Sequence, residues 1–171
     1  PNISMFLSGD RELKFLIIRF SSIGDIVLTT PVIRCLKKRY PEAEIHYLTK
    51  KSFAGIITSN PYVHKVHCLE NDLSETIGIL KAEQVDHIID LHNNLRTIRI
   101  KRALKIPFHS FDKLNAKKWL LTNLKINLMP HKHIVERYME TVSFLGVVND
   151  GLGLDYFIPE NDYVKEDDIP F

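Results

Sequence analysis

Asp25 is the carboxylate of this sequence that is best placed to take part in chemistry. It follows a continuous apolar run and a short polar turn, and a helical pattern begins directly after it. Ligands of open α/β sheets bind beyond the carboxyl ends of the strands, so a carboxylate at this position can contribute to chemistry there. The same position suits the N-cap of a helix, and the local pattern leaves both interpretations open. The turn before Asp25 contains Ser21, Ser22 and Gly24.

A second group of polar side chains follows another apolar strand pattern, in the segment DLHNNLRT at residues 90–97. Because the carboxyl ends of parallel strands meet at one edge of a sheet, His92, Asn93 and Arg96 are predicted to border the same crevice as Asp25. Capping of the next helix by Asn93 or Asn94 is the structural alternative.

A third group lies on one helical pattern, in which His133 and Arg137 are four residues apart and Glu136 is their neighbour. The spacing does not match the HExxH pattern of zinc proteases. A surface pair of side chains, worth a few tenths of a kcal/mol, is the alternative to a functional role.

Several common cofactor sites are not predicted. Gly24 is the single glycine between Arg19 and Pro31, so neither a GxGxxG nor a P-loop pattern is present. Cys35 and Cys68 lack the spacing of metal ligands and are expected to be buried thiols. We therefore expect no metal and no bound cofactor.

Strand and helix patterns alternate along the chain, which predicts an α/β fold with a parallel sheet and right-handed crossovers. Pro31 predicts either a kink or a helix restarted after a cap at Thr30, and Gly146 is placed to end the last helix. The predicted strands are residues 13–20, 44–49, 64–69, 86–91 and 106–111. The predicted helices are residues 26–40, 51–59, 73–83, 93–104, 112–124 and 133–145.

The net charge of +2 over 171 residues conceals a basic middle and an acidic end. Ten lysines and arginines but one acid, Asp112, lie in residues 91–132. Little aromatic interleaving and no recognition module accompany them, so we expect an anionic phosphorylated or membrane-borne partner and no nucleic acid. Basic residues on solvated helix faces are the structural alternative. No apolar run reaches the ~20 residues of a membrane span, and residues 1–10 lack a secretory pattern. A cytoplasmic location is expected.

Three segments together resemble one family: FLIIRFSSIGDIVLTTP at residues 15–31, DLHNNLRT at 90–97, and HIVERYMETVSFLG at 133–146. They are similar to the bacterial heptosyltransferases of glycosyltransferase family 9, which transfer heptose from ADP-heptose to the inner core of lipopolysaccharide. The resemblance runs in order over about residues 13–159.

The resemblance implies a Rossmann-like three-layer α/β/α domain with a mostly parallel sheet, the N-terminal half of a GT-B glycosyltransferase. It places an extension at residues 1–12, the acceptor-binding domain at 13–158 and the start of an interdomain linker at 159–171. Its expected partners are the nucleotide-sugar donor, its own C-terminal donor-binding domain, and an anionic lipopolysaccharide acceptor at the inner membrane surface. The location implied is cytoplasmic and peripheral to that membrane.

The resemblance also implies an inverting transfer without an obligatory metal, in which Asp25 deprotonates the acceptor hydroxyl. Ser21, Ser22 and Gly24 would support Asp25 near the donor phosphates. The substrate-binding residues that it implies further along the chain are His92, Asn93, Arg96, His133, Glu136 and Arg137.

A different interpretation stays open from the residues alone. A non-catalytic, flavodoxin-like α/β module would use Asp25 as a helix cap and its basic segment to bind an anionic partner. A nucleotide-dependent oxidoreductase is disfavoured, because the chain lacks the glycine fingerprint.

Overall fold

The computed structural model describes residues 12–112, 132–159 and 162. Its centre is a five-stranded sheet in the order β3-β2-β1-β4-β5, and all four strand pairs are parallel. The predicted parallel α/β fold is therefore confirmed. The strands are β1 (Lys14–Ile18), β2 (Glu44–Lys50), β3 (Lys65–Leu69), β4 (His87–Asp90) and β5 (Phe108–Ser110).

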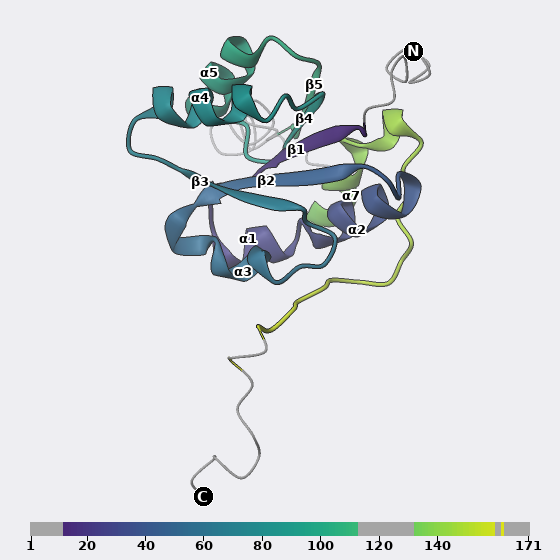
Figure 1. Cartoon of the computed structure of the whole chain (residues 1–171). Helices are drawn as coiled ribbons and strands as arrows, with labels where there is room; N and C mark the ends of the chain where they lie inside the picture. The colour runs from purple at the N-terminus through teal and green to yellow at the C-terminus, as the bar shows by residue number, and fades with distance from the viewer. Residues whose placement is uncertain (1–11, 113–131, 160–161, 163–171) are drawn as a thin grey trace, which may run out of the picture.

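Helices cover both faces of the sheet and make three layers (Figure 1). One face carries α4 (Leu73–Ala82) and α5 (Leu95–Leu104). The opposite face carries α1 (Ile23–Val27), α2 (Thr30–Arg39), α3 (Gly55–Thr58) and α7 (Ile134–Glu140), and the 3₁₀ turns are η2 (Lys51–Phe53) and η3 (Ser143–Leu145).

The two covered faces explain the unbroken apolar run of β1. Ile17 packs into the core beneath α1, α2 and α7, whereas Leu16 and Ile18 pack into the core beneath α4 and α5. All three side chains are completely buried. A strand buried on both faces cannot alternate apolar with polar residues, so β1 reads as a continuous apolar run.

Two predicted helices are each divided in the structure. The predicted helix 26–40 is α1 followed by α2, and α2 is capped by Thr29, one residue before the predicted cap. Pro31 lies in the first turn of α2, where its missing N–H group costs no helical hydrogen bond. The predicted helix 133–145 ends at Glu140 and continues as η3, which Gly146 closes with a left-handed φ of 70°.

Some predicted segments lie mostly outside the residues that the structure describes. The predicted helix 112–124 lies outside the described residues except for Asp112, as do the extension at 1–12 except for its last residue and most of the linker at 159–171. None of the helices in the described part of the chain is long and apolar enough to cross a lipid bilayer.

His87 makes the stability of the fold sensitive to acid. Its side chain is buried, and its Nε2 atom lies 3.0 Å from Nδ1 of His109. Burial together with the charge of His109 lowers the pKa of His87 to about 4. In the unfolded chain His87 takes up a proton near the ordinary pKa of 6.5. Its contribution to the free energy of unfolding is therefore fully present above about pH 6.5 and is lost between about pH 6.5 and 4.

We expect the urea midpoint of unfolding to fall across this range. The His87→Gln variant should show a shallower decline than the wild-type chain when urea titrations at pH 7 and pH 5 are compared. Equal slopes in the two proteins would contradict the assignment.

Candidate active site

Asp25 lies in the first turn of α1, directly beyond the carboxyl end of β1. Its Oδ2 atom accepts hydrogen bonds from the backbone N–H of Ser22 at 3.2 Å and from the Ser22 hydroxyl at 3.0 Å. Ser22 is the N-cap residue of α1, and Asp25 is the third residue of that helix. The alternative that Asp25 is itself the N-cap is therefore wrong in position, although Asp25 does contribute to the cap.

Arg19 holds the same carboxylate oxygen from the other side. One guanidinium nitrogen lies 2.6 Å from Asp25 Oδ2, and the other two donate to the carbonyl oxygens of Ser21 and Leu91, each at 2.7 Å. Arg19 is 9% exposed, so it links the turn after β1 to the end of β4 from within the protein. Sequence reasoning missed it. The available signal was a single arginine at the end of an otherwise apolar run.

The second oxygen of Asp25 is left available. Among the described residues, every hydrogen bond and ion pair of this side chain uses Oδ2, and the side chain is 36% exposed. Burial acts to raise the pKa of Asp25, but the hydrogen bonds from Ser22 and the Arg19 charge outweigh it and hold this pKa below the ordinary value. Asp25 is thus an ionised carboxylate with one fixed oxygen and one oxygen free to accept a proton.

The end of β4 is organised by Asp90, which is completely buried. Its Oδ1 atom accepts the backbone N–H groups of His92 and Asn93 at 3.1 and 2.7 Å, and its Oδ2 atom forms an ion pair with Lys101 at 2.7 Å. His92 packs against the ring of Phe20 with a centroid separation of 4.8 Å. The buried carboxylate thereby fixes the turn that connects β4 to α5.

The two asparagines after β4 have different roles. Asn94 is the N-cap of α5, because its side-chain oxygen accepts the N–H groups of Arg96 and Thr97. The capping alternative is correct for Asn94. Asn93 adopts a left-handed φ of 47° and donates its amide to the carbonyl of Phe111 at 2.8 Å, so it shapes the turn.

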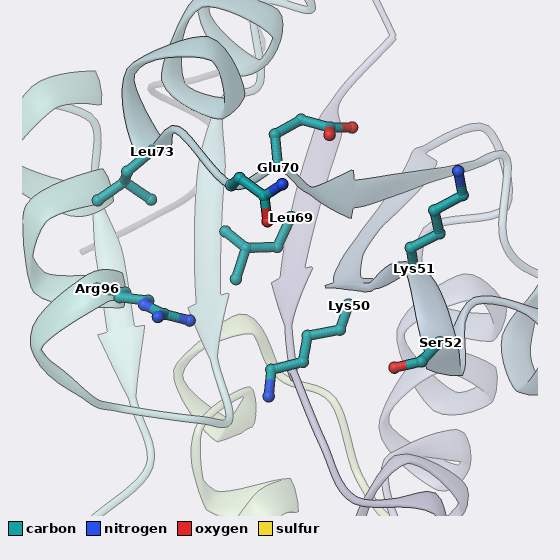
Figure 2. Close-up of a pocket in the computed structure, with 8 residues that line it drawn as sticks. Lys50, Lys51, Ser52, Leu69, Glu70, Leu73 and Arg96 are labelled. Carbon is teal, nitrogen blue, oxygen red and sulfur yellow. The ribbon is translucent and has the colours of Figure 1, made fainter.

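A cationic pocket of about 290 Å³ lies beyond the carboxyl ends of β2 and β3 (Figure 2). The side chain of Arg96 extends from the start of α5 toward the part of this pocket where the amino group of Lys50 lies. Sequence reasoning identified Arg96 but missed the lysines, although they directly follow a predicted strand. The lining residues are Lys50, Lys51, Ser52, Leu69, Glu70, Asn71, Leu73 and Arg96.

The third predicted group is divided by the structure. His133 is the N-cap of α7, and with Glu136 it lines a pocket of about 300 Å³ beside Pro31 and Gly153. Arg137 points elsewhere: it donates to the carbonyl of Asp112, and its guanidinium lies over the ring of Phe111. The expected side-chain pair of His133 and Arg137 is not formed among the described residues.

Helix α7 reaches the Asp25 site through Tyr138. The guanidinium of Arg19 lies 5.8 Å from the centre of the Tyr138 ring, and that ring is buried. The motif that contains His133 therefore supports the site by packing beneath Arg19.

The segment after η3 is fixed to α2 by a buried arginine. Arg34 forms ion pairs with Asp150 and Asp155, and it donates to the carbonyl of Gly153 at 3.0 Å. This arginine holds the pKa of Asp150 well below its ordinary value, mainly by hydrogen bonding. These contacts of Arg34 therefore fix the path of residues 150–155 beside the pocket that His133 and Glu136 line.

Comparison with known proteins identifies relatives over most of the chain. No protein-family model matches it. Lipopolysaccharide heptosyltransferase 1 of Campylobacter coli is 27% identical over 164 residues, which are 91% of this chain and 46% of that protein. The chain spans about half the length of the curated relatives it matches.

Two solved structures have a fold similar to that of this chain. The glycosyl transferase family 9 protein of Veillonella parvula matches 87% of this chain and 46% of its own, with a TM-score of 0.71 and 21% identity. The E. coli heptosyltransferase WaaC, solved with ADP, matches 84% of this chain and 50% of its own, with a TM-score of 0.64 and 22% identity. The chain is thus similar in sequence to curated lipopolysaccharide heptosyltransferases and similar in fold to solved structures of a glycosyl transferase family 9 protein and of a heptosyltransferase, and it spans about half of their length.

Proposed function

We propose that this chain is the N-terminal, acceptor-binding domain of an inverting heptosyltransferase with a GT-B architecture. The observation that carries the proposal is Asp25, whose carboxylate is ionised and fixed through one oxygen by Ser22 and Arg19. Its other oxygen is available at the edge of the sheet where such folds bind ligands. We refer to a protein in which this chain is joined to a donor-binding domain as the two-domain protein.

The proposed reaction is a displacement at the anomeric carbon of heptose. The acceptor hydroxyl gives its proton to Asp25 while its oxygen forms a bond to the anomeric carbon, and the bond from that carbon to the ADP oxygen breaks. Attack from the face opposite ADP inverts the configuration. Because the pKa of Asp25 is low, its carboxylate is ionised at neutral pH, the form that can accept a proton.

The cationic pocket is the proposed site for an anionic group of the acceptor. Lys50, Lys51 and Arg96 line it, and charge-assisted hydrogen bonds from such groups to phosphate or carboxylate are strong. Lipopolysaccharide precursors lie at the inner membrane, so we propose a cytoplasmic enzyme that is peripheral to this membrane. Basic side chains in residues 91–132 favour an anionic surface.

Charge reversal in this pocket tests the proposed acceptor site. Arg96→Glu in the two-domain protein should raise the KM for the acceptor about 10- to 100-fold, because one charged hydrogen bond is worth about 1.5–3 kcal/mol. The KM for ADP-heptose should stay unchanged.

Arg102→Glu is the matched control, because Arg102 is an exposed residue of the same helix and lies outside the pocket. An equal rise in acceptor KM for both variants would show that general surface charge, and not this pocket, binds the acceptor.

A further inference from the structure

Two buried histidines and a glutamate converge on the face of the sheet beneath α4. His46 lies on β2, His67 lies on β3, and Glu83 directly follows α4. The Nδ1 atom of His46 is 3.0 Å from Nε2 of His67 and 3.9 Å from a carboxylate oxygen of Glu83. The three ligand atoms lie within 4.8 Å of one another. Three separate elements thus bring two imidazole nitrogens and one carboxylate oxygen to a single point.

The neighbouring carboxylate fixes the tautomer of His46. Its Nε2 atom lies 3.1 Å from an oxygen of Glu44, which pairs in turn with Lys14 at 2.9 Å. Since Glu44 is ionised, Nε2 carries the proton and donates it, which leaves the lone pair of Nδ1 directed toward His67. A carboxylate that orients a histidine through its second nitrogen is the usual outer partner of a metal-bound imidazole.

The surroundings keep both imidazoles neutral, as metal binding requires. His46 and His67 are 1% and 6% exposed, and burial lowers the pKa of both, that of His67 to about 4. Lys65 holds one oxygen of Glu83 at 2.6 Å, and the other oxygen lies on the His46 side. Because Glu83 is more exposed than the histidines, it marks the side from which an ion can enter.

The distances suit a small tetrahedral ion. Zinc–nitrogen bonds of about 2.0–2.1 Å place two tetrahedral ligand nitrogens roughly 3.3 Å apart, close to the 3.0 Å between His46 and His67. Two histidines and one carboxylate form a common zinc ligand set, with water as the fourth ligand. Magnesium and calcium, by contrast, prefer oxygen ligands throughout.

We propose that His46, His67 and Glu83 bind one divalent transition-metal ion, for which zinc is the best match. The site lies at the third residue of β2 and at the middle residue of β3, whereas the cationic pocket lies beyond the carboxyl ends of both strands. The ion therefore ties β2, β3 and α4 together and takes no part in sugar transfer. No metal is expected from the sequence, and we depart from that expectation because the fold brings together three residues that have no motif spacing.

The test is a titration of the chelator-treated chain with zinc chloride, followed by calorimetry and by competition with a chromophoric chelator. We expect one bound zinc ion per chain and a rise in Tm. Cobalt(II) should give the intense visible absorption of a tetrahedral complex. His67→Gln and Glu83→Gln should each abolish this absorption and weaken zinc binding at least 100-fold, while Glu44→Gln should weaken binding about 10- to 100-fold.

The matched control is His87→Gln. His87 and His109 form a second buried pair with the same 3.0 Å separation, but no carboxylate completes a three-ligand group with them among the described residues. This variant should bind zinc like the wild-type chain. Circular dichroism of each metal-free variant establishes that it is folded.

The visible absorption of the cobalt(II)-loaded wild-type chain tests the proposal even if a histidine variant fails to fold. An octahedral cobalt spectrum, no saturable zinc binding, or equal zinc affinity in the folded Glu83→Gln variant would each overturn it.

Discussion

Replacement of Asp25 by asparagine is expected to lower the rate of heptose transfer by the two-domain protein by about 10²- to 10⁴-fold, the usual contribution of a general base. Asparagine has nearly the same shape, and its side-chain oxygen can still accept the backbone N–H of Ser22. It cannot accept a proton from the acceptor hydroxyl. The KM values for donor and acceptor should therefore change little, while kcat falls.

Ser22→Ala is the matched control for Asp25→Asn. It removes the hydroxyl that donates to Asp25 at 3.0 Å but leaves the carboxylate and its ion pair with Arg19. We expect a smaller loss in kcat than for Asp25→Asn, because the proton-accepting carboxylate remains and is still held by Arg19 and by the backbone N–H of Ser22. If Asp25→Asn keeps near wild-type activity and loses only stability, Asp25 is a capping residue, as in the non-catalytic alternative.

Replacement of Lys101 by methionine is expected to lower the free energy of unfolding by about 3–5 kcal/mol. Lys101 is 6% exposed, and it forms the ion pair of the completely buried Asp90 and donates to the hydroxyl of Ser110 at 2.7 Å. Methionine fills similar space but leaves the Asp90 charge without its counterion. Urea denaturation of the chain measures the loss.

The neighbouring Arg102→Met provides the reference, because Arg102 is exposed and surface substitutions usually change stability by less than about 0.5 kcal/mol. The double variant Asp90→Asn with Lys101→Met should recover part of the loss, since it removes the unpaired charge. Equal stability of Lys101→Met and Arg102→Met would contradict the role assigned to this pair.

Local sequence patterns predicted the parts of the site that follow directly from a strand. The buried run of β1, the glycine turn and Asp25 are adjacent in sequence, so strand periodicity and turn composition placed them correctly. The same reasoning predicted that Arg96 borders the crevice of Asp25, whereas the structure places Arg96 at the cationic pocket, whose lining does not include Asp25. Helix boundaries were less accurate, because the break between α1 and α2 depends on the Thr29 cap, and a continuous helical pattern obscures it.

Contacts between distant segments could not be predicted in this way. Arg19 reaches the carbonyl of Leu91, 72 residues away, and His46 meets His67, 21 residues away. Such pairs depend on which strands become neighbours, and that order follows from the packing of the whole sheet. Lys50, by contrast, could have been predicted. Like Asp25, it lies at the carboxyl end of a predicted strand, where such folds bind ligands.

The most direct test of the account is the mass of the acceptor after reaction with ADP-heptose. The two-domain protein is incubated with ADP-heptose and a lipopolysaccharide acceptor that lacks inner-core heptose, and the acceptor is analysed by mass spectrometry. The account predicts an acceptor heavier by one heptose residue, with release of an equal amount of ADP. An unchanged acceptor in the presence of bound ADP-heptose would contradict it.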